Sequence, residues 1–131
     1  MSNKNGVLYL VQKEPWFSMT KSGQKQEEYR EIKPYYTDKW IHPFDKRLAA
    51  TLLNALGVQT IQNKFLIEDT NKILNQLQYH TVHFSNGMPK RGTSPEKHIE
   101  FRKPKIRISE GRPEWGAEPH KLYFVITWEK K

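Results

Sequence analysis

The stretch SGQKQEEYREIKP, Ser22–Pro34, decides the fold, because it joins a helix stop, a strand and the densest run of charge in the chain. Gly23 follows an apolar segment and is typical of the residue after a helix, where a left-handed backbone is easiest without a Cβ. Glu27–Ile32 places alternate side chains on opposite faces if it is extended, which predicts a strand. Pro34 ends this strand because proline has no N–H to donate to a ladder.

Hydrophobic periodicity predicts the elements on either side of this stretch. Short alternating or β-branched runs predict strands, and apolar residues at helical spacing predict helices. The expected strands are 7–11, 27–32, 81–85, 98–109 and 122–128, and the expected helices are 14–22, 45–56 and about 68–78. Several strands with only three helices predict an α+β fold, a curved sheet or small β-barrel with peripheral helices.

Length and composition point to a single domain spanning residues 1–131. The chain is 36% hydrophobic, which is enough for a core, and it has no apolar run of the roughly 20 residues that a membrane span needs. The absence of cysteine excludes disulfides and thiolate metal sites and fits a cytoplasmic protein. No membrane partner and no cofactor are expected.

The formal net charge is +8, the sign expected of a surface that meets phosphates. Most of the excess falls in one segment, Thr81–Arg112, where eight basic residues stand against three acidic ones. The basic residues are Lys90, Arg91, Lys97, Arg102, Lys103, Lys105, Arg107 and Arg112. The same charges could simply keep the surface solvated, but their concentration in one segment favours a binding face.

The charges of the opening stretch could also carry chemistry. A buried lysine beside a carboxylate can exchange protons, and an arginine offers a planar fork to phosphate or to a base edge. Lys25, Glu28 and Arg30 are the candidates. The alternative is an exposed strand with ordinary surface ion pairs, each of little energetic value.

The opening stretch also resembles the signature of ASCH-domain proteins, small relatives of the PUA domain. That signature is an apolar helix, a glycine, a lysine two residues later, and a strand carrying a charged residue, an aromatic or aliphatic one and arginine. The matching residues are Trp16, Phe17 and Met19, then Gly23, Lys25, Glu28, Tyr29 and Arg30. Two further pieces, 82–87 and 111–119 followed by 123–126, resemble the phage and bacterial branch of this family. About 37–79 has no counterpart and is interpreted as a helical insertion.

The resemblance implies a PUA-like β-barrel with a basic cleft between the barrel and the first helix, suited to RNA or a modified nucleotide. It also implies a second possibility, a hydrolase: some members are described as ribonucleases and one branch as amidohydrolases on an acylated nucleoside. Lys25 matches the catalytic lysine of that branch, whereas Glu28 stands where it has threonine. Lys25 and Glu28 would then form an acid–base pair.

The residues expected to bind the ligand combine cations with aromatic rings that can stack on a base. They are Lys25, Tyr29, Arg30, Lys33, Tyr35, Asn86 and Trp115. No metal site is expected, because His80 and His83 would point to opposite faces of a strand and the other histidines show no ligand spacing.

A third possible function, besides nucleotide binding and hydrolysis, is that of a protein-interaction module that uses the helical insertion as its contact surface.

Overall fold

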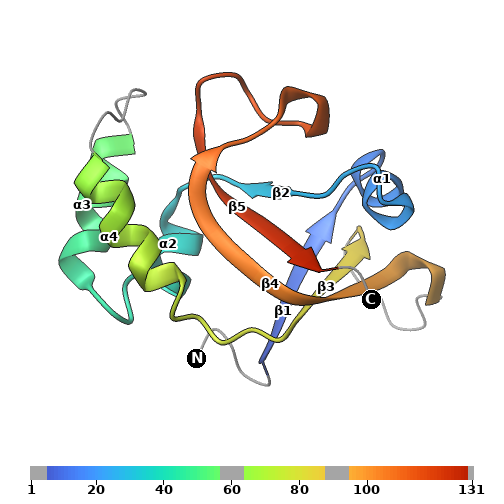
Figure 1. The fold of residues 1–131 in the computed structure, drawn as a ribbon, viewed down its shortest axis with the longest axis horizontal. Coiled ribbons are helices and arrows are strands. Elements are labelled where there is room, and N and C mark those ends of the chain that lie inside the picture. The colour runs from blue at the N-terminus through green and yellow to red at the C-terminus, as the bar shows by residue number, and fades with distance from the viewer. Residues whose placement is uncertain (1–5, 57–63, 88–94, 130–131) are drawn as a thin grey trace.

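The computed structural model describes residues 6–56, 64–87 and 95–129, and its framework is a five-stranded mixed sheet (Figure 1). The strand order is β1-β3-β4-β5-β2. Only the β1–β3 pair is parallel among these neighbours. The strands are β1 (Val7–Gln12), β2 (Glu28–Arg30), β3 (Thr81–Asn86), β4 (His98–Glu110) and β5 (Leu122–Glu129).

The described residues form four α-helices: α1 (Trp16–Ser22), α2 (Pro34–Trp40), α3 (Lys46–Leu56) and α4 (Lys64–Leu74). Figure 1 shows α2, α3 and α4 grouped at one end of the sheet and α1 at the other. Two short 3-10 turns, η2 (Pro95–Lys97) and η3 (Pro113–Trp115), precede and follow β4. No helix within the described ranges is long and apolar enough to cross a bilayer.

The two faces of the sheet are defined by the alternation along β5. Phe124 and Ile126 belong to the main core with the helices, and this side is called the inner face. Tyr123 and Val125 pack in a second, smaller cluster on the opposite side, called the outer face. Successive side chains of a strand point to opposite faces, so both faces of the sheet are covered near β5.

A β-bulge in β4 keeps its apolar residues on the inner face on both sides of Pro104. Arg102 pairs with Glu129 and Lys105 with Thr127, so β4 carries one extra residue between these pairs. Lys103, inside the bulge, has a left-handed φ of 52°. The extra residue shifts the alternation by one. As a result, the core-facing set changes from Ile99 and Phe101 to Ile106 and Ile108.

The predicted α+β class is confirmed, but the described sheet is open and not a closed barrel. β1 and β2 are its two edges and are not hydrogen-bonded neighbours. β2 has only three residues, all paired with β5, which limits what its backbone could offer another strand. The expected curved sheet is the alternative that agrees with this topology.

Several element boundaries differ from the prediction. The helix expected at 68–78 begins four residues earlier, at Lys64, and α2 was not expected. Pro34 ends the extended segment as predicted and is also the first residue of α2, where its missing N–H costs nothing. The loop expected at 88–97 falls largely outside the described residues, with Lys90 and Arg91.

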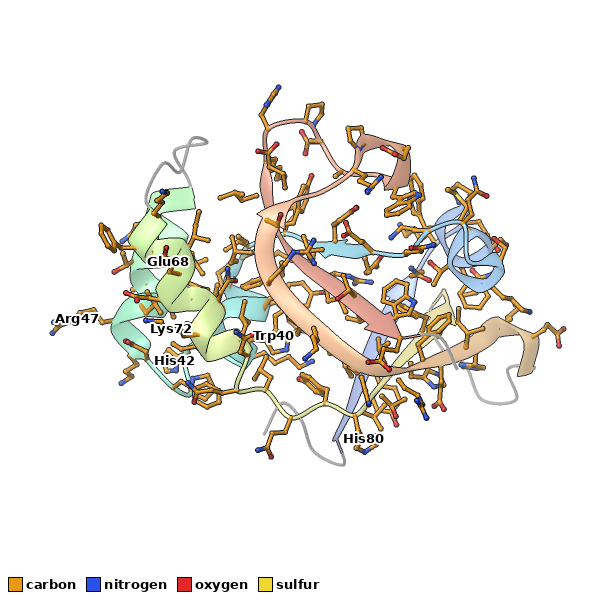
Figure 2. All side chains as sticks on the ribbon, in the orientation of Figure 1. Trp40, His42, Arg47, Glu68, Lys72 and His80 are labelled. Carbon is orange, nitrogen blue, oxygen red and sulfur yellow. The ribbon has the colours of Figure 1, made fainter. Side chains whose placement is uncertain are left out.

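Trp40, the last residue of α2, joins the helical group to the sheet. It is fully buried, stacks on Tyr36 and meets Phe124 of β5 edge to face, and its indole N–H donates to the Tyr79 hydroxyl at 3.1 Å. Figure 2 shows Trp40 between the helices and the sheet.

Trp40→Ala should therefore lower the free energy of unfolding by about 3–5 kcal/mol, because it leaves a large cavity at this junction. Urea denaturation followed by circular dichroism measures the change. A loss below about 1 kcal/mol would show that the helical group does not share the core of the sheet.

Candidate functional site

The two edge strands are linked by side chains where their backbones do not pair. The Gln12 side-chain N–H of β1 donates to Glu28 Oε1 of β2 at 3.1 Å. In the other direction, the Arg30 guanidinium of β2 donates to the backbone carbonyl of Val11 in β1 at 2.6 Å. These groups and Lys25 are called the polar seam, which consists of Gln12, Lys25, Glu28 and Arg30.

The Glu28 carboxylate is the centre of the polar seam. Oε1 accepts from Lys25 Nζ at 2.9 Å, and Oε2 accepts from Arg30. Lys25 also donates to the backbone carbonyl of Glu27. Lys25 reaches this position because Gly23 is left-handed, with φ 88°, and the next turn ties the Lys25 N–H to the Met19 carbonyl at 2.9 Å.

The polar seam holds three charged groups away from water. Lys25 is 1% exposed and Glu28 is 7% exposed. Burial lowers the pKa of Lys25, and the neighbouring Glu28 carboxylate offsets only part of this effect. Burial also opposes the charge of Arg30, but Glu28 and Tyr36, whose hydroxyl it contacts at 3.1 Å, outweigh it and raise the pKa of Arg30.

The contact between Lys25 and Glu28 is short enough for proton exchange, yet both groups are covered. An acid–base pair must come within hydrogen-bond reach of its substrate, directly or through one water. With Lys25 almost completely buried, this conformation offers a substrate no access to the amine. What the observed arrangement does is join β1, β2 and the turn after α1.

A second group of residues lines an open cleft of about 240 Å³ on the surface, called the outer cleft. Its lining residues are Gln26, Glu27, Arg112, Trp115, Thr127 and Trp128. The Arg112 guanidinium lies over the Trp115 ring, 5.0 Å from its centre. A cation stacked on an indole at the mouth of a cleft offers a flat surface and a positive charge together.

Tyr29 ties the opening stretch to the wall of the outer cleft. Its ring packs on the outer face against Tyr123, and its hydroxyl donates to Glu27 Oε1 at 2.7 Å and accepts from the Arg112 N–H at 2.9 Å. Gly111 permits this approach, because a Cβ there would lie 2.6 Å from the Tyr29 ring.

Cations from the basic segment lie beside the outer cleft. Lys105 pairs with Thr127 across β4 and β5, and the Arg107 guanidinium donates to Glu27 Oε2 at 3.0 Å. Both side chains are exposed. Lys105 has no salt bridge to another described residue, so its charge is available to a ligand.

The remaining expected ligand residues lie elsewhere. Lys33 precedes α2 and Tyr35 belongs to it, whereas none of α2 lines the outer cleft. Asn86 donates to Glu14 Oε2 at 2.9 Å, and the Glu14 carboxylate in turn accepts from the Ser18 N–H and hydroxyl at the start of α1. Through Glu14, the Asn86 side chain therefore helps to fix the start of α1.

The structure thus divides the expected site into several groups, two of which are adjacent, because Lys25 Nζ lies 5.1 Å from the centre of the Tyr29 ring. Lys25, Glu28 and Arg30 meet in the polar seam, while Tyr29 and Trp115 lie on the outer side. Sequence reasoning found the basic segment but did not single out Thr127 or Trp128. The signal available for them was the β5 alternation, with Trp128 two residues beyond Ile126 on one face and Thr127 on the other.

Comparisons of the chain with protein-family models, curated proteins and solved structures found no match. The resemblance of the opening stretch to ASCH-domain proteins stays a prediction.

Glu28→Gln should destabilise the fold by about 3–5 kcal/mol, because it leaves two buried cations without their counter-charge. Chemical denaturation at neutral pH measures this loss. Glu31→Gln is the matched control: Glu31 lies on the same segment, is 59% exposed and pairs with Lys121 at 3.2 Å. Its replacement should cost less than about 1 kcal/mol. Equal costs for the two variants would contradict a structural role for the polar seam.

The lowered pKa of Lys25 also predicts that the free energy of unfolding depends on pH. Burial holds the folded pKa of Lys25 below the ordinary value of 10.5, so between these two pKa values the unfolded chain binds more protons and stability rises with pH. Lys25→Met removes this contribution. The unfolding free energy of the wild type minus that of Lys25→Met should therefore increase as the pH rises toward 10.5. A difference that stays flat or falls over this range would contradict the lowered pKa.

Proposed function

We propose that the chain binds single-stranded RNA or a nucleotide in the outer cleft. The observation that carries the proposal is the Arg112–Trp115 stack in the lining of the cleft. Aromatic and guanidinium planes are the surfaces on which proteins stack unpaired bases. A base placed against this stack would keep its phosphate near the cations of β4.

The charge beside the cleft matches the chemistry of a nucleic-acid backbone. Lys105 and Arg107 are exposed on the outer face, and Arg102 and Lys103 are exposed along the same strand. Contacts of lysine and arginine with phosphates release counterions and supply much of the affinity for nucleic acids. The basic segment predicted from the sequence is therefore a candidate path for the backbone.

Polar groups inside the cleft could read a base edge. The Glu27 carboxylate is held in place from two sides, by the Tyr29 hydroxyl and by Arg107. Thr127 adds a hydroxyl to the lining and Gln26 adds an amide. A fixed carboxylate accepts hydrogen bonds from amino groups such as that of cytosine, which supports recognition of a base or modified nucleotide.

The proposal places the ligand on the outer face of β2, opposite Glu28 and Arg30, with the buried Lys25 Nζ 5.1 Å from the centre of the Tyr29 ring. An ASCH-like cleft beside the first helix was the expectation, and the opening stretch does contribute one wall of the outer cleft through Gln26 and Glu27. The burial of Lys25 and Glu28 supports a structural role for them. We do not extend the proposal to hydrolysis, because this acid–base pair is covered.

Trp115→Ala should weaken binding of a fluorescently labelled single-stranded RNA by about 5- to 150-fold, the loss of one stacking contact. Fluorescence anisotropy at low salt measures the affinity. Lys105→Ala should weaken binding more uniformly across sequences and reduce the slope of log affinity against log salt by about 1.

Tyr35→Ala is the control, because Tyr35 forms a similar exposed pair with Lys39, 5.4 Å away, but on α2 and outside the cleft. Its affinity should equal that of the wild type. The proposal fails if Tyr35→Ala matters more than Trp115→Ala, or if the wild type binds neither RNA nor nucleotides at low salt.

A further inference from the structure

Two histidines that are far apart in the sequence meet on the sheet. His83 lies in β3 and His98 begins β4. Their facing ring nitrogens, His83 Nε2 and His98 Nδ1, are 3.0 Å apart. The other ring nitrogen of His83, Nδ1, contacts Glu100 Oε2 at 2.8 Å.

Glu100 determines how the His83 imidazole presents its nitrogens. A carboxylate accepts but cannot donate, so it favours the proton on His83 Nδ1. In a neutral ring this leaves the lone pair on Nε2, pointing toward His98. A carboxylate behind an imidazole is the arrangement that orients metal-binding histidines and increases their basicity.

The spacing of the two nitrogens fits one metal ion. With metal–nitrogen bonds of 2.0–2.1 Å, nitrogens at a right angle are separated by about 2.9 Å and those at a tetrahedral angle by about 3.3 Å. The observed 3.0 Å lies between these values. A metal ion would take the place of the proton that the two rings otherwise share.

The pair is also accessible. The His83 side chain is 21% exposed, His98 is half-buried, and the Glu100 side chain behind His83 is 47% exposed. Within the described ranges, no group of three or more His, Cys, Asp and Glu side chains gathers as a metal site. The two imidazoles would thus supply one edge of the coordination sphere and leave the other positions to water or another small oxygen ligand.

We propose that His83 and His98 bind a late first-row divalent metal ion, of the class of Cu²⁺, Ni²⁺ or Zn²⁺, with Glu100 as the positioning carboxylate. Imidazole ligands suit these ions, whereas Mg²⁺ and Ca²⁺ prefer oxygen. The inference stands on the His83–His98 geometry and does not depend on nucleic-acid binding at the outer cleft.

Titration of the tag-free protein with Zn²⁺ and Cu²⁺, followed by calorimetry, tests the site. One ion should bind per chain, and excess Mg²⁺ should not compete. His83→Gln and His98→Gln should each weaken binding by at least about 10-fold, and Glu100→Gln by about 10-fold. His42→Gln is the control, because Figure 2 places His42 on the helical side of the molecule, and its affinity should be unchanged.

NMR of the wild-type imidazoles gives a readout that needs no variant. Zn²⁺ should shift the resonances of His83 Nε2 and His98 Nδ1 and leave those of His42 and His120 in place. The proposal is overturned if His98→Gln binds as tightly as the wild type. It is equally overturned if the resonances of His83 and His98 do not respond to the metal.

Discussion

The Glu28 carboxylate, with two cations bound to it, is the constraint on which the rest of the structure depends. It accepts from Lys25, Arg30 and Gln12, and so joins the turn after α1 to both edges of the sheet. β2 has only three residues, so backbone pairing alone holds it weakly. Fixing Glu28 on the inner face necessarily sends Tyr29 to the outer face, where it builds the wall of the cleft.

Burying these charges has a cost that a hydrophobic cluster would not have. The polar seam instead fixes the positions of β1, β2 and the turn after α1 relative to one another. Arg30 reaches the Val11 carbonyl at the open edge of β1, which would otherwise be available to another chain. The side-chain amide oxygen of Gln12, Oε1, and Arg30 Nε are buried without a hydrogen-bond partner among the described residues, so the polar seam is satisfied only in part. The arrangement favours one geometry of the strand edges over maximal stability.

The sequence was sufficient for the elements whose signals are local. The Gly23 helix stop and the opposite facing of Glu28 and Tyr29 follow from backbone preferences and from the period of a strand. Which of these two faces is buried depends on packing that a single strand does not reveal. The aromatic α2 has no helical stripe long enough to detect, and the contact of His83 with His98 exists only because β3 and β4 pair in one register. Spacing along the chain therefore could not show it.

The central claim is that the outer cleft, and not the polar seam, meets the ligand. Of the four tryptophans, Trp115 lines the cleft, the ring of Trp128 at its border packs on the inner face against Phe84 and Phe101, and Trp40 is buried beside the helices. Each indole N–H gives a separate NMR signal, so titration with a short single-stranded RNA reports all of these places at once. The Trp115 signal should shift as RNA is added, while that of Trp40 stays in place. A shift of Trp40 with no change at Trp115 would contradict binding in the outer cleft.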